Sequence, residues 1–124
     1  FAGVDILNGG IQGGFNHSFP IARNRFWVNC FWGTQFFVVH SKFFDKILNS
    51  YFSEQDTADN FISSLTIEKM VFFPFISVQK DFGYSDIKLD NFRGDLSKLF
   101  KSAEHRLQTC EAAYIKFVER TKVL

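Results

Sequence analysis

Two cysteines and three histidines are the residues of this 124-residue chain best suited to nucleophilic or metal chemistry. The histidines, His17, His40 and His105, do not repeat at the i, i+4 spacing that places two imidazoles on one helix face. The two thiols do not form a Cys-x-x-Cys pair and cannot complete a tetrahedral zinc site by themselves. We therefore expect no metal and no cofactor, and an enzyme is the least favoured of the functions considered below.

Cys30 and Cys110 both stand in apolar surroundings, and two states are open to them. They are either free, buried thiols that serve packing, or a disulfide that closes a loop of about 80 residues in an oxidising compartment. A secreted or periplasmic location is slightly favoured, because the chain begins at Phe1, which is consistent with a removed leader. The triplet Asn16-His17-Ser18 makes Asn16 a candidate glycosylation site.

Aromatic residues are the strongest compositional signal, with 18 Phe and two Trp. The segment 23–27, RNRFW, combines cations with aromatic rings. Two arginines on a chain of net charge +1 are too few to follow a phosphate backbone, so we expect no nucleic-acid partner. We take Arg25, Trp27 and Trp32 as candidate contact residues for a ligand or partner.

The leading functional hypothesis is a non-catalytic protein-binding module: an inhibitor, an immunity-type protein or a subunit of an assembly. Its partner would be another protein or the same chain, since large aromatic side chains commonly anchor interfaces. The alternative is a carrier of an apolar small molecule in a Phe-rich pocket. No transmembrane segment is expected, because the longest apolar stretch, residues 26–39, is shorter than the roughly 20 residues that a span needs.

A long amphipathic helix is the clearest predicted element, over residues 95–122 and about 40 Å long. Its apolar stripe comprises Leu96, Leu99, Phe100, Ala103, Leu107, Cys110, Tyr114, Phe117, Val118 and Thr121. Ile115 lies off this stripe and is a further candidate contact residue. Two shorter helices are predicted, one capped by Ser41 and one that contains Ala58, Phe61, Ile62 and Leu65.

Residues 20–40 support two interpretations. Ser18 as a cap and Pro20 in a first turn favour a helix. The alternation from Phe26 to Thr34 and the Val, Phe and Trp content favour strands.

With the helical interpretation preferred, the expected fold is mainly α: a compact bundle of three or four helices that ends in the long helix. The alternative is an α+β fold with a small sheet from residues 25–40 and 69–79. Residues 1–124 are expected to form a single globular domain, in which residues 1–16 are a Gly-rich arm or turn segment.

Overall fold

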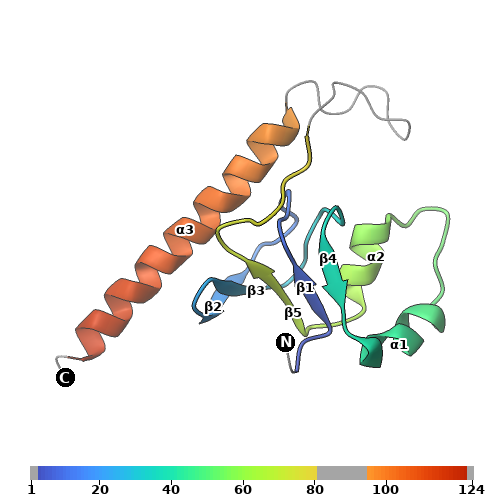
Figure 1. The fold of residues 1–124 in the computed structure, drawn as a ribbon, viewed down its shortest axis with the longest axis horizontal. Coiled ribbons are helices and arrows are strands. Elements are labelled where there is room, and N and C mark those ends of the chain that lie inside the picture. Colours follow the sequence, from blue (N-terminus) through green and yellow to red (C-terminus); the bar gives the residue numbers. More distant parts are fainter. Residues whose placement is uncertain (1–2, 81–94, 123–124) are drawn as a thin grey trace.

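The computed structural model describes residues 3–80 and 95–122. These residues form a five-stranded mixed sheet and three α-helices, of which α3 is much the longest (Figure 1). The expected helical bundle is therefore wrong, and the α+β alternative describes the fold. In chain order the elements are β1 (Ile6–Asn8), β2 (Ser18–Ala22), β3 (Arg25–Val28), β4 (Phe37–Val39), the 3-10 helix η1 (Ser41–Phe43), α1 (Phe44–Leu48), α2 (Ala58–Ser64), β5 (Lys69–Phe72) and α3 (Asp95–Thr121).

The strand order is β2-β3-β5-β1-β4, so the late strand β5 is inserted between two early ones. It pairs parallel with β1 and antiparallel with β3. Strand β1 is an inner strand whose three residues are all buried, although it lies within the Gly-rich segment expected to be an arm or turn. Glycine has a different role there: a Cβ on Gly10 would collide with the carbonyl oxygen of Ser77, so this segment packs closely against residues that follow β5.

Residues 18–28 form a β-hairpin rather than a helix. Phe26 and Val28 are each 1% exposed, and Arg25 and Trp27 alternate with them, which is the period of a strand. Pro20, interpreted above as a helix residue, is accommodated because β2 is an edge strand. Asn24 takes a positive φ of 61° at the turn between β2 and β3.

The other three predicted helices are present, with differences at their ends. His40 rather than Ser41 caps the first of them, since its side chain accepts a hydrogen bond from the Lys42 N–H. The second is α2, and the third is α3, which ends at Thr121.

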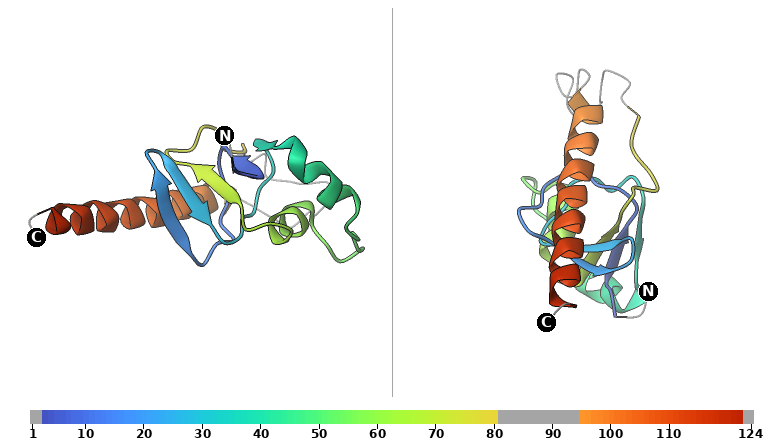
Figure 2. Two further views of the ribbon diagram at one scale, coloured as in Figure 1. Left: turned by 90° about the horizontal axis from the view of Figure 1, so that it is seen from below. Right: turned by 90° about the vertical axis from the view of Figure 1, so that its left-hand side faces the viewer.

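Helix α3 covers one face of the sheet, and its C-terminal end projects beyond the strands (Figure 2). Leu107 in the first half is fully buried, whereas Phe117 in the second half is 64% exposed. The core lies between α3 and the sheet, and its buried members are Ile6, Ile11, Phe15, Phe26, Val28, Phe31, Phe43, Val71, Ala103 and Leu107.

Candidate functional site

The face of the sheet that points away from α3 carries an unbroken row of apolar side chains, one from each strand. Consecutive members of the row are directly opposite each other in the strand pairing, and alternate residues of the same strands form the core beneath α3. We call this side the open face and the side beneath α3 the covered face. From β2 to β4, the row on the open face is Phe19, Trp27, Met70, Leu7 and Val38.

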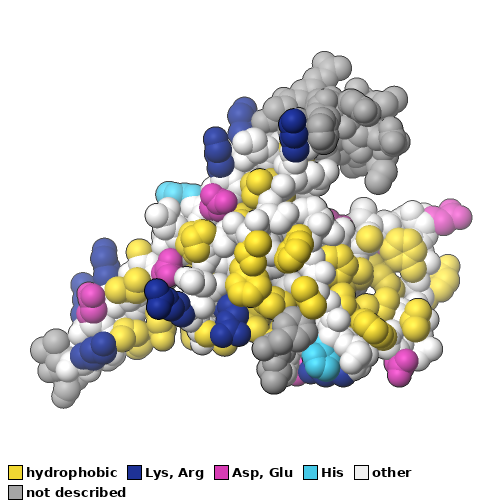
Figure 3. All heavy atoms as spheres, in the orientation of Figure 1, with side chains coloured by type: hydrophobic (Ala, Val, Ile, Leu, Met, Phe, Trp, Pro, Cys, Tyr) yellow, Lys and Arg dark blue, Asp and Glu magenta, His cyan; other side chains and the backbone are white. Residues whose placement is uncertain are grey.

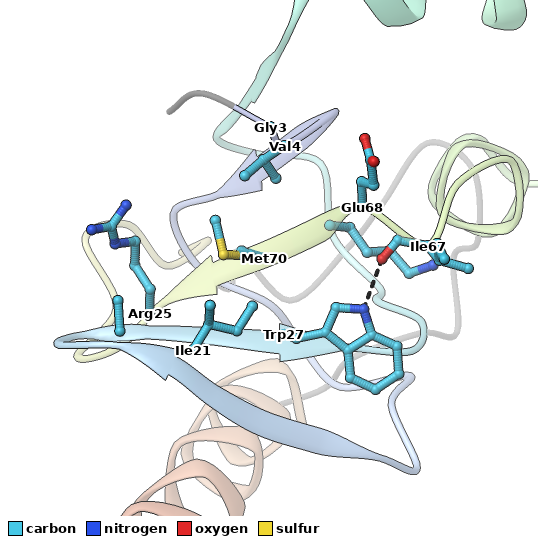
Figure 4. Close-up of a pocket in the computed structure, with 10 residues that line it drawn as sticks. Gly3, Val4, Ile21, Arg25, Trp27, Ile67, Glu68 and Met70 are labelled. Carbon is cyan, nitrogen blue, oxygen red and sulfur yellow. Dashed lines mark hydrogen bonds between the residues drawn. The ribbon is translucent and has the colours of Figure 1, made fainter.

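The open face is hollowed by a depression of about 440 Å³, here called the open-face pocket (Figure 4). Met70 and Val4 contribute buried apolar surface to it, at 7% and 8% exposure. The Trp27 ring forms one side and is held in place, because its Nε1–H donates to the Ile67 carbonyl oxygen at 2.7 Å. Ile21 lies on the same side of the strands, between Arg25 and Trp27 in this view.

Charged side chains stand at the two ends of the open-face pocket. Arg25 is at one end, and it makes no ion pair with any described residue. Glu68 is at the other end, where Lys42 Nζ lies 2.7 Å from its carboxylate and 3.3 Å from that of Asp5. Chiefly because of the hydrogen bond to Glu68, the pKa of Lys42 is raised above its ordinary value. Lys42, the cation at the Glu68 end, is therefore already paired with carboxylates, whereas Arg25 at the opposite end is not.

Lys69 is the one buried lysine among the described residues, at 3% exposure. Its Nζ donates to the carbonyl oxygens of Ser63, at 2.7 Å, and Thr66, so that it satisfies the backbone at the end of α2. Burial lowers the pKa of this ammonium group. The contacts explain Lys69 as a structural residue.

Cys30 and Cys110 are free thiols, so the disulfide considered above is wrong for this structure. The Cys110 thiol donates to the Ser18 carbonyl oxygen at 3.6 Å and is therefore turned towards β2. Nowhere in residues 3–80 and 95–122 do three or more His, Cys, Asp or Glu side chains gather in a way that could hold a metal ion.

The four candidate contact residues are distributed over three places. Arg25 and Trp27 both line the open-face pocket. Trp32 lies elsewhere, 45% exposed, with its Nε1–H donating to the Asn60 side chain at 3.0 Å. Ile115 is 48% exposed on the far half of α3, where it borders a smaller depression next to the β2–β3 hairpin. Asn16, the candidate glycosylation site, is exposed.

The sequence analysis missed the other residues that line the open-face pocket, among them Val4, Ile21, Glu68 and Met70. Their one sequence signal was the extended character of residues 69–79, which placed Met70 on a strand without showing its neighbours. The pocket exists because β1 and β3 both pair with β5, and those contacts join residues more than 40 positions apart.

No family model, curated protein or solved structure matches this chain. No helix in the described part of the chain is long and apolar enough to cross a membrane.

Proposed function

We propose that this chain is a non-catalytic protein-binding module and that the open face of its sheet is the contact surface. The observation that carries the proposal is the apolar row from Phe19 to Val38. Apolar sheet faces are normally buried against a second layer. Here the two ends of the row, Phe19 and Val38, are 59% and 45% exposed.

The composition of the open face supports a protein partner. Trp and Met are enriched in protein interfaces, as is Arg, and Trp27, Met70 and Arg25 meet in the open-face pocket. The surface seen in Figure 3 also carries many apolar side chains. They lie over the strands in the centre of the view and over the α1–α2 end at the right. Large contiguous patches of exposed apolar side chains are typical of surfaces that bind another macromolecule.

Site-specific photocrosslinking in the cells that make this protein tests the proposal. p-Benzoylphenylalanine replaces Phe19 or Val38 on the open face, and Lys101 or Gln108 at exposed control positions on α3. We expect both open-face positions to form one discrete adduct, identified by mass spectrometry and shared between them. The control positions should not form it.

Adducts that are equally abundant at Lys101 and Gln108 would contradict the proposal, because they would reflect random collision. Absence of any adduct at Phe19 and Val38 would contradict it as well. An adduct of twice the mass of the chain would identify the partner as a second copy and would keep the open face as the contact surface.

A further inference from the structure

We propose that the open-face pocket binds an extended segment of the partner protein in which a carboxylate side chain lies two residues from an apolar one. This inference rests on the proposed function, because it specifies the chemistry of the partner. It is carried by the charge of Arg25, by the rigidity of the hairpin and by the spacing of Arg25 and Trp27.

Arg25 supplies the charge complementarity. Arg25 lines the open-face pocket and pairs with no described carboxylate, whereas Lys42 at the other end is held by Asp5 and Glu68. Lys69 also lines the pocket, but its ammonium group is buried and donates to backbone carbonyl oxygens instead. A guanidinium group presents parallel N–H donors that match a carboxylate, and charge-assisted bonds of this kind are the stronger hydrogen bonds in proteins. Glu68 disfavours a carboxylate at its own end, so that the segment has a defined register.

The Trp27 side chain and the backbone that carries Arg25 are held in place before anything binds. Arg25 begins β3 directly after Asn24, whose backbone carbonyl accepts a hydrogen bond from the Phe73 N–H at 3.0 Å. Trp27 is fixed by its own hydrogen bond to Ile67. A preorganised site loses less conformational entropy on binding, which favours a short peptide segment as its ligand.

The spacing on β3 sets the spacing in the ligand. Arg25 and Trp27 are two residues apart on the same face of the strand, which separates their Cα atoms by about 6.5 Å. An extended segment along β3 repeats at the same distance. It can therefore place a carboxylate on Arg25 and an apolar side chain against Trp27 and Met70 at the same time.

Two synthetic peptides test the inference: N-acetyl-Phe-Ala-Glu-Ala-Phe-amide and the same peptide with Gln in place of Glu. The central residue has a Phe two positions away on both sides, so that either chain direction satisfies the spacing. Binding is followed by NMR at the Trp27 indole N–H, with the Trp32 indole as an internal reference. We expect the Glu peptide to bind roughly three- to tenfold more tightly than the Gln peptide, since the Arg25 side chain is partly exposed.

The variant Arg25→Gln should remove the difference between the two peptides, and Arg25→Lys should retain part of it. Arg23→Gln is the matched control, because Arg23 is the neighbouring exposed arginine of the same hairpin and is not among the residues that line this pocket. It should leave the difference intact.

Equal binding of the Glu and Gln peptides would overturn the inference, and so would the absence of binding by both. If neither peptide binds while Phe19 and Val38 still form their shared crosslink, only this inference fails and the proposed function stands. If the crosslink is absent as well, both fail.

Discussion

The two faces of the sheet consist of alternate residues of the same five strands, yet α3 covers only one of them. On the covered face, Ile6, Phe26 and Val71 are at most 1% exposed beneath α3. On the open face, the inner positions Leu7 and Met70 are nearly buried, but Phe19 and Val38 at the two ends are half-exposed. The apolar character of the two faces is similar, and the difference lies in their cover.

The apolar side chains of the open face indicate that a second layer is missing from it. A sheet with one solvated face normally alternates apolar and polar residues along each strand, and a sheet covered on both sides does not. At Phe26-Trp27-Val28 and Met70-Val71-Phe72, β3 and β5 have the apolar runs of a sheet covered on both sides. Helix α3 supplies only one of those covers, and the proposed partner would supply the other.

Truncation of one phenylalanine on each face is expected to give the largest contrast. Phe26→Ala should lower the free energy of unfolding by about 3–5 kcal/mol, because it leaves a cavity beneath α3. Phe19→Ala, on the neighbouring strand, should cost less than about 1 kcal/mol, because its ring is already largely in water. Urea denaturation measures both, and Val71→Ala gives a smaller loss of the same sign if Phe26→Ala does not fold. Similar losses at Phe26 and Phe19 would show that the open face is covered in solution by self-association.

Helix α3 was predictable from the sequence because its signal is local and long. Leu96, Phe100, Ala103 and Leu107 repeat at alternating spacings of four and three, and all four are buried. The same stripe continues through Tyr114 and Phe117, which are 43% and 64% exposed. Periodicity thus showed which face of the helix is apolar, but it did not show where the sheet beneath it ends.

The sheet was harder to predict because its strands have only three to five residues. So short a strand contains too few alternations to outweigh a false helix signal such as Ser18 and Pro20. The candidate site was only half predictable for the same reason. Arg25 and Trp27 were found because they are only two residues apart in one short segment, but β5 brings Met70 to them through pairing that no local pattern encodes.

Lys69 and Lys42 should make the free energy of unfolding depend on pH, and the dependence due to Lys69 should be the larger. Burial lowers the pKa of Lys69 in the folded state below its ordinary value of 10.5. Between those two pKa values the unfolded chain binds more protons than the folded one, so the contribution of Lys69 to stability increases as pH rises towards 10.5. A neutral amine retains two N–H donors, which suffice for the carbonyl oxygens of Ser63 and Thr66.

The variant Lys69→Met isolates this contribution. The difference in unfolding free energy between wild type and variant should change in favour of the wild type as pH rises, up to about 10.5. Urea midpoints at a series of pH values measure the change. A difference that is constant over the same range would mean that Lys69 has its ordinary pKa in the folded protein. Its ammonium group would then remain solvated despite its burial.

Lys42 should give the smallest effect, with the opposite sign. Its pKa is raised, chiefly by the hydrogen bond to Glu68, so the folded state retains a proton that the unfolded state loses at about 10.5. The stability that Lys42 contributes is therefore fully present below pH 10.5 and is lost as pH rises through the raised pKa of the folded state.

Because the ion pair between Lys42 and Glu68 is exposed at the rim of the open face, added salt should weaken it, whereas the contribution of Lys69 should be insensitive to salt. The advantage of wild type over Lys42→Met should thus shrink both above pH 10.5 and in about 0.5 M NaCl, where screening acts within a few ångströms. If the stability that Lys42 contributes does not change with added salt, the Glu68 end of the open face is shielded from water. Only the end that contains Arg25 would then differ from the covered face in its exposure to solvent.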